Sequence, residues 1–335
     1  MSNRVLIPLD MDEPPALPPD AVQHSLAGAA MGTTWSVHAL APRGVARETI
    51  AAAVEAQLAR VIREMSTWEP DSLISRFNRA EAGSWHALPE AFHAVLDAAL
   101  TMAVDSDGAF DPTVGPLVNL WGFGPATDSV PSHAVPDQAA LTQARARCGW
   151  RRIGLDRATR SALQPGGAYL DFSGIAKGYA VDLVAQALRE AGCASWLAEI
   201  GGELSGMGLK ADGQPWWVAL ERPPLDGGAA LLAALHGMAI ATSGDYRRHF
   251  EQDGRRYAHT IDPRSGSPVR HDLASVTVLH PSCMVADALA TALTVLGEEE
   301  GMAFARRRNV AALFIGGAAS GFRERMTPAM AAMLE

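Results

Sequence analysis

Apolar residues in the first third of the chain recur at the three- and four-residue spacing of amphipathic helices. Between residues 48 and 65 this spacing is carried by Ile50, Val54, Leu58, Val61, Ile62 and Met65. A second such segment runs from Pro89 to about Val104, and proline suits the first turn of a helix because its missing N–H needs no partner there. The pattern therefore predicts two helices before residue 105.

Strand patterns dominate the second half of the chain. Residues 33–40, TTWSVHAL, already alternate as a half-buried strand does. Further short β-rich runs are SWLAEI, WWVALE, MAIATS, YAHTID and ASVTVLH. Asp253-Gly254 predicts a hairpin turn within EQDGRRYAHTI, and GGE at 201–203 predicts a tight turn with a structural role.

Two later segments return to helical spacing. Residues 175–191 carry an apolar side, and Gly192 follows where such a helix would end. Residues 283–296 form another helical segment, with Ser282 as N-cap and Gly297 as its end. Because helices cluster early and strands late, without regular βαβ alternation, we expect an α+β fold whose mixed or antiparallel sheet is flanked by helices.

Stretches rich in proline and glycine predict the domain organisation. Residues 1–25 form a proline-rich segment, which we expect to be a loose extension. Residues 26–335 are enough for one large domain. The stretch 122–137, GFGPATDSVPSHAVPD, is the clearest internal loop, and we expect any division into two subregions to fall there.

Charge and cysteine content narrow the class of partner. The net charge of −9 argues against nucleic acid and against anionic membranes as main partners, although local cations still allow an anionic small molecule. Three widely spaced cysteines predict reduced thiols rather than disulfides or a zinc site. The first 25 residues contain no signal peptide, lipobox or membrane span, so we expect a cytoplasmic protein, or a periplasmic one if a leader precedes this sequence.

The segment 171–182, DFSGIAKGYAVD, begins a predicted helix with small and charged residues. Backbone N–H groups at a helix start attract anions, and glycines let a phosphate approach the main chain. Lys177 would oppose the helix dipole unless an anionic ligand shares the site. The motif is not a P-loop, and an ordinary helix start with an exposed lysine explains this stretch equally well.

A second candidate is the pair Asp287 and Thr291. Four positions apart, they share one face of a predicted helix whose other residues are alanine and leucine. A buried carboxylate needs a partner, and carboxylate and hydroxyl oxygens suit Mg²⁺ better than zinc. Taken alone, the spacing favours a structural role: Asp287 bonding a backbone donor and Thr291 bonding its own helix.

Histidine and aromatic residues supply weaker signals. His259 is a possible base near neutral pH, although a lone histidine on a strand is more often structural. Trp68 precedes a turn, and residues 108–124 combine glycine, proline and aromatics, which can stack on a planar ring or fill core edges. Met31 could contact such a ring or serve in packing.

Taken in order, eight motifs carry a specific resemblance. They are MGTTW, MSTWEPDSLISRFN, GAFDPTVGPLVNLWGFG, DFSGIAKGYAVD, EIGGELSGMG, ATSGDYRR, HTIDPRSGSPV and ADALATAL. From about Met31 to Ile315 the sequence strongly resembles the ApbE family, FAD:protein FMN transferases. The resemblance implies an α+β fold with FAD in a cleft between two subregions. It also implies Mg²⁺-dependent transfer of FMN from FAD to a threonine or serine of an acceptor protein, with release of AMP.

The resemblance also implies roles for individual residues. FAD contacts are expected from Met31, Trp68, Ala109, Phe110, Asp111, Asp171, Lys177, His259 and Ile261. The metal is expected at the carbonyl of Gly174 and the side chains of Asp287 and Thr291. Catalytic roles are expected for Lys177, Asp287 and His259, the histidine assisting removal of the acceptor hydroxyl proton.

One position departs from the family pattern, and two other functions share the expected site. Many members have an aspartate immediately before the metal threonine, where this sequence has Ala290, so one potential ligand is missing. Many relatives are exported lipoproteins, a feature these first residues do not share. The alternatives to transfer are an FAD pyrophosphatase that yields FMN and AMP, and a protein that binds or carries FAD without turnover.

Overall fold

The computed structural model describes residues 4–9, 11–125, 135–222, 230–244, 248–317 and 322–335. Its centre is an eight-stranded sheet in which every neighbouring pair is antiparallel. In spatial order the strands are β18 (Arg323–Met326), β17 (Ala311–Gly316), β16 (Leu273–His280), β11 (Met238–Gly244), β8 (Glu203–Met207), β7 (Ser195–Ile200), β3 (Thr33–Ala41) and β2 (Val22–Ala30). The predicted α+β class with an antiparallel sheet is confirmed.

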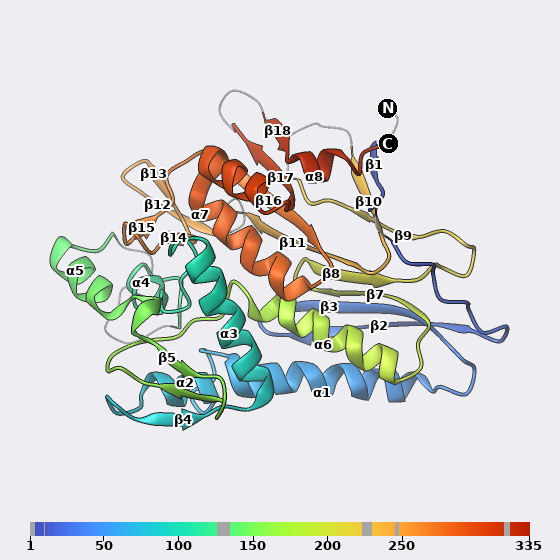
Figure 1. Ribbon diagram of the computed structural model, residues 1–335, viewed down its shortest axis with the longest axis horizontal. Helices are drawn as coiled ribbons and strands as arrows, with labels where there is room; N and C mark the ends of the chain where they lie inside the picture. Colours follow the sequence, from blue (N-terminus) through green and yellow to red (C-terminus); the bar gives the residue numbers. More distant parts are fainter. Residues whose placement is uncertain (1–3, 10, 126–134, 223–229, 245–247, 318–321) are drawn as a thin grey trace.

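Helices cover one face of this sheet. They are α1 (Arg47–Met65), α3 (Glu90–Asp105), α6 (Ala176–Glu190) and α7 (Cys283–Arg307). Figure 1 shows α6 and α7 lying over the strands and α1 beside α6, and their apolar sides share one buried cluster with the sheet. All four predicted helices are confirmed, with starts within one residue of the prediction for α1, α3, α6 and α7.

Helix α7 differs from its prediction at the C-terminal end. Gly297 adopts a φ of 76°, as expected of a helix stop, but the chain resumes helical geometry and continues to Arg307. Beside this kink, Nε2 of His271 donates a hydrogen bond to the carbonyl of Thr294 at 2.6 Å. The side chain from another segment therefore stabilises a bent helix where local glycine chemistry predicts an end.

A three-stranded sheet covers part of the opposite face. Its order is β1 (Arg4–Leu6), β10 (Leu231–Leu235) and β9 (Trp216–Ala219), and α8 (Pro328–Ala331) packs beside it. Leu6 is fully buried in this layer. Part of the segment 1–25, expected to be loose, is therefore packed into the fold, and β2 begins at Val22. Three residues are too short a run for periodicity to reveal a strand.

A smaller apolar cluster lies to one side, where Figure 1 shows α4, α5 and the β12–β15 strands. It is formed by Leu117, Trp121, Phe123, Ala144, Phe250 and Ile261. The elements concerned are α4 (Gly115–Leu120), α5 (Gln138–Arg147), β12 (His249–Gln252), β13 (Arg255–Ala258), β14 (Ile261–Asp262) and β15 (Ser267–Pro268). The predicted hairpin at Asp253-Gly254 is confirmed, since β12 pairs with β13 and both turn residues have positive φ. Of the predicted loop 122–137, residues 126–134 lie outside the described part of the chain.

The remaining elements connect these layers. They are α2 (Leu73–Asn78), β4 (Trp85–Ala87), a 3₁₀ turn (Trp150–Arg152), β5 (Gly154–Asp156) and β6 (Ser161–Leu163). Strands β4, β6 and β5 pair into a small antiparallel sheet.

The N-terminus of α7 is held by an aspartate on α6. The carboxylate of Asp182 accepts hydrogen bonds from the hydroxyl of Ser282 and the backbone N–H of Cys283, both at 2.8 Å. It also accepts from the N–H of Met284 at 3.0 Å, while Ser282 caps the helix in the usual way through the N–H of Val285. One carboxylate thus fixes where α7 starts relative to α6.

Replacing Asp182 with alanine should therefore lower the free energy of unfolding by about 2 kcal/mol, because two N–H groups at a helix start lose their acceptor. Urea denaturation measures the change. Asp182→Asn keeps one acceptor oxygen and should lose less. An alanine variant as stable as the unaltered protein would show that this cap does not hold the helix.

Candidate active site

Two turns meet at one end of the large sheet. Met31 and Gly32 connect β2 to β3 and have φ angles of 53° and 72°. Gly201 and Gly202 connect β7 to β8 and also have positive φ. The N–H of Gly201 donates to the carbonyl of Thr34 at 3.0 Å, which joins the turns side by side. The predicted GGE turn is confirmed, and it leads Glu203 into the site described next.

The start of α6 and the loop before it contact the N-terminal half of α7. The N–H of Gly178 donates to Oδ2 of Asp287 at 2.9 Å. A Cβ built on Gly174 would lie 2.8 Å from Oγ1 of Thr291, so this backbone passes against the threonine hydroxyl and only glycine fits. The structure therefore brings together Gly174, Asp287 and Thr291, three residues separated by more than 100 positions of sequence at their widest.

Burial sets the electrostatics of Asp287. Its side chain is 4% exposed, and burial raises the pKa of the Asp287 carboxyl, although Lys177 and the N–H of Gly178 oppose the rise. The hydrogen bond from Gly178 is the backbone contact expected if Asp287 has a structural role. Yet it occupies one oxygen only, and Oδ1 accepts no hydrogen bond from any residue within the described ranges. This oxygen is available to a cation.

The hydroxyl of Thr291 does not form the hydrogen bond to a carbonyl of its own helix, α7, that a structural role would give it. Its Oγ1 lies 3.3 Å from Oγ of Ser243, which stands near the end of β11. The helix and the sheet end are thus linked through two hydroxyl groups. A hydroxyl can still accept or coordinate through its other lone pair.

Lys177 forms an ion pair that sequence reasoning missed. Its Nζ contacts Oε1 of Glu203, the first residue of β8, and Glu203 is 2% exposed. Burial lowers the pKa of Lys177, but the charges of Glu203 and Asp287 outweigh it and raise that pKa overall, so the lysine stays charged at neutral pH. The available signal was a carboxylate directly after two glycines in EIGGE, which a turn alone does not need.

The donor set fits a hard divalent cation. No group of three or more histidine, cysteine, aspartate or glutamate side chains in the described part of the chain could hold a metal. The predicted set contains a single carboxylate, with a carbonyl and a hydroxyl, so it falls outside that kind of cluster. Carbonyl, carboxylate and hydroxyl oxygens are the ligands that Mg²⁺ accepts together with phosphate oxygens and water.

Asp111 and Asp171 are held by their own loops. Oδ1 of Asp111 accepts from both the N–H and the hydroxyl of Thr113, at 2.7 and 2.6 Å, and Oδ2 accepts from the N–H of Trp150 at 3.3 Å. Burial raises the pKa of Asp111 against these hydrogen bonds. The N–H of Asp171 donates to the carbonyl of Pro112 at 2.8 Å. The two aspartate loops are therefore neighbours.

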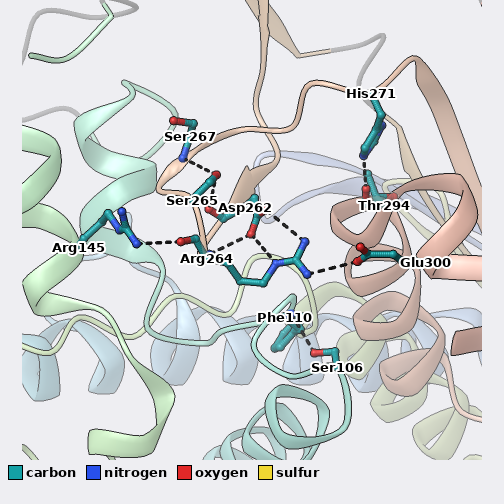
Figure 2. Close-up of polar contacts among 10 residues, drawn as sticks. All are labelled: Ser106, Phe110, Arg145, Asp262, Arg264, Ser265, Ser267, His271, Thr294 and Glu300. Carbon is teal, nitrogen blue, oxygen red and sulfur yellow. Dashed lines mark hydrogen bonds and ion pairs between the residues drawn. The ribbon is translucent and has the colours of Figure 1, made fainter. Parts of the chain in front are cut away.

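Phe110 links these loops to the metal candidates. One of its ring carbons would lie 3.4 Å from a Cβ built on Gly174. Ala109 and Phe110 are 1% and 4% exposed, and the N–H of Phe110 donates to Oγ of Ser106 at 3.0 Å (Figure 2). This segment of predicted FAD contacts thus directly adjoins Gly174.

Ile261 belongs to the smaller apolar cluster, and His259 contacts that cluster through Phe123. Nδ1 of His259 lies 3.1 Å from the carbonyl of Arg248, and because a carbonyl only accepts, Nδ1 is the donor. The imidazole meets the ring of Phe123 edge-on at 6.3 Å, and Ile261 is 5% exposed. Trp68 lies on the turn before α2, with 60% of its surface exposed.

The turn after Ile261 is clamped between two helices. The guanidinium of Arg264 donates to Asp262 at 3.0 Å and pairs with Glu300 on α7 at 3.6 Å (Figure 2). From α5, Arg145 donates to the carbonyl of Arg264 at 2.9 Å. These contacts tie the segment that carries Ile261 to the helix that carries Asp287.

Gly178 sets how closely α6 approaches α7. A Cβ there would lie 2.3 Å from the carbonyl oxygen of Cys283 and 2.8 Å from Cβ of Asp287. Gly178→Ala should cost about 1–3 kcal/mol of folding stability, because backbone cannot move aside as a side-chain end can. Urea denaturation measures this. The control is Gly44→Ala, where a Cβ meets nothing within 4 Å; equal stability of both variants would contradict the close approach.

These features define an α+β protein with an oxygen-rich, lysine-containing site where a helix start meets a second helix at one end of an antiparallel sheet. Residues 31–314 match the model of the ApbE family. The chain therefore belongs to the ApbE family.

Individual relatives agree with this assignment. The chain is 42% identical to the FAD:protein FMN transferase of Vibrio cholerae, over 91% of this chain and 90% of that protein. It is 39% identical to the FAD:protein FMN transferase of Haemophilus influenzae, over 93% and 91%. The apo crystal structure of the Pseudomonas stutzeri flavinyl transferase ApbE superposes with a TM-score of 0.86 at 41% identity, covering 93% of this chain and 97% of that one.

None of the described helices combines the length and the apolar character needed to cross a bilayer. The cytoplasmic location expected from the sequence stays a prediction.

Proposed function

We propose that this protein transfers FMN from FAD to a threonine or serine hydroxyl of an acceptor protein, with Mg²⁺ as cofactor and AMP as the second product. The observation that carries the proposal is the contact between the loop 171–178 and α7, which gathers Lys177, Asp287 and Thr291. The names of the relatives supply the reaction. The threonine or serine acceptor and the metal come from the family resemblance.

The chemistry needs positive charge at the dinucleotide's phosphates. The acceptor oxygen attacks the phosphorus on the FMN side, the bond from that phosphorus to the bridging oxygen breaks, and AMP leaves with that oxygen. Negative charge grows on the phosphate oxygens and on the leaving group. Lys177 is charged and 31% exposed, so its ammonium can reach a phosphate while its pair with Glu203 is retained.

A metal would add to this charge. Bound by the carbonyl of Gly174, Oδ1 of Asp287 and the hydroxyl of Thr291, Mg²⁺ would supply Lewis-acid stabilisation of the phosphate oxygens. The buried position of Asp287 suits this role, because burial raises the pKa of its carboxyl and a nearby cation would stabilise the charged form.

His259 is the proposed acceptor of the hydroxyl proton. Its Nδ1 donates to the carbonyl of Arg248, which orients the ring. The other proposed FAD contacts are Met31, Trp68, Ala109, Phe110, Asp111, Asp171 and Ile261.

Incubation with FAD, Mg²⁺ and a purified protein bearing exposed threonine and serine residues tests the proposal. Covalent flavin on that protein, seen as fluorescence in a denaturing gel, together with AMP supports transfer. AMP and free FMN without an acceptor would identify a pyrophosphatase instead, and FAD binding with no AMP under any condition would identify a binding or carrier protein.

A further inference from the structure

Glu203 lies in the site without being needed for the turn it follows. The turn is held by other groups: the N–H of Gly201 donates to the carbonyl of Thr34, and the N–H of Gly202 donates to Oε1 of Glu199 at 2.8 Å. The Glu203 carboxylate contributes to neither bond. It points instead to Lys177 on α6, 26 positions earlier in the chain.

We propose that Glu203 is the positioning residue for Lys177, holding Nζ at the phosphate site and keeping it charged. Lysine is a point charge on a flexible four-carbon chain, and an ammonium in a buried setting loses its proton unless a counter-charge faces it. The ion pair itself is independent of the reaction, whereas its consequence for turnover rests on the proposed function.

The burial of Glu203 argues against a direct part in proton transfer. Its side chain is 2% exposed, and Oε2 is buried without a hydrogen-bond partner among the residues that the structure describes. An acceptor hydroxyl approaching FAD cannot reach this oxygen. The carboxylate therefore acts through Lys177, which is the more exposed member of the pair.

Among the residues that the structure describes, three titratable groups act most strongly on Lys177. They are Glu203 from β8, and Asp287 and Cys283 from α7. Burial raises the pKa of the Cys283 thiol well above its usual value, so Cys283 is neutral. Burial raises the pKa of Glu203 to about 7, and the charge of Lys177 opposes that rise, so the pair stabilises the charged form of both partners. If Asp287 serves a cation, as proposed, Glu203 is the group left to balance the lysine charge. With Asp287 facing the cation and Glu203 facing Lys177, each of the two buried carboxylates has a separate role.

The chain offers a clean test, because Lys177 and Lys210 are its two lysines. Acetic anhydride acetylates only the uncharged amine, so the labelling rate of each lysine between pH 8 and 11, followed by peptide mass spectrometry, reports its pKa. Lys210 is an internal reference. In Glu203→Gln, which keeps the shape of the side chain, the labelling profile of Lys177 should shift to lower pH by at least about one unit.

Matched variants separate positioning from damage to the turn. Glu199→Gln removes the same charge from the same turn and keeps an acceptor for Gly202, so its Lys177 profile should match the unaltered protein. Glu203→Ala should shift the profile at least as far as Glu203→Gln. A Lys177 profile that does not move in either Glu203 variant would overturn the proposal, and so would an equal shift in Glu199→Gln.

Turnover provides the second readout. Glu203→Gln should lower kcat for AMP release from FAD about tenfold or more, with a smaller change in KM. In a Lys177→Gln background the same change should cost less than twofold, because a residue that acts through Lys177 has nothing left to position. Additive losses would contradict the inference. Absence of AMP release from the unaltered protein would refute the proposed function, while the labelling result would still decide the role of Glu203.

Discussion

Replacing Asp287 with alanine is expected to abolish magnesium-dependent AMP release from FAD, with a loss of at least about a thousandfold. Asp287 is the one carboxylate of the proposed metal set, and no residue in the described part of the chain donates a hydrogen bond to its Oδ1. A carboxylate oxygen is a hard ligand of the kind that Mg²⁺ prefers. Chromatographic measurement of AMP over a range of Mg²⁺ concentrations gives both the rate and the metal dependence.

Two further variants define what the Asp287 result means. Asp287→Asn keeps an oxygen for the N–H of Gly178 but loses the charge, so it should fold normally and remain inactive. Asp212→Asn changes an exposed aspartate in the surface loop between β8 and β9 and should leave the rate unchanged. Unaltered AMP release from a folded Asp287→Ala protein would remove this residue from the site.

Lys177→Ala is expected to lower kcat/KM for AMP release by about a hundredfold, the usual cost of removing one charge-stabilising donor. The variant removes the ammonium that faces the phosphates and leaves Glu203 as an uncompensated buried carboxylate. We therefore also expect weaker FAD binding, measured by quenching of flavin fluorescence in the absence of Mg²⁺.

The second lysine is the matched control. Lys210→Ala removes the same charge from a loop between β8 and β9 and should retain both FAD affinity and turnover. Wild-type affinity and rate in Lys177→Ala would exclude a phosphate role for Lys177. A loss in Lys210→Ala of similar size would point to net charge rather than to this site.

Local chemistry was enough to predict most secondary structure. The ends of α1 and α6 follow from apolar spacing and stop residues that act within one or two turns. The β12–β13 hairpin follows from Asp253-Gly254, whose backbone preferences need no partner. Helix α7 shows the limit, since its continuation past Gly297 involves His271, a residue from a separate segment.

Some residues of the site could likewise be predicted from local sequence, and others could not. Lys177, Asp287 and Thr291 were recognisable because their types and spacing are unusual on apolar helices, and because ordered motifs placed them in a family. Glu203 was assigned only a turn, since nothing within EIGGE shows that its carboxylate lies against a lysine on another element. For Asp287, the spacing favoured a structural role, and the structure shows that Oδ2 does accept a backbone hydrogen bond, from Gly178.

By itself, then, the sequence determined where the four main helices start, the β12–β13 hairpin, the α+β class and the residue types available for phosphate and metal chemistry. Only the tertiary structure decided that Gly178 meets Asp287 and that Lys177 pairs with Glu203. The physical reason is that caps, turns and periodicity arise from neighbours a few residues apart. Contacts across 26 or 109 positions depend instead on strand order and on how closely two helices pack.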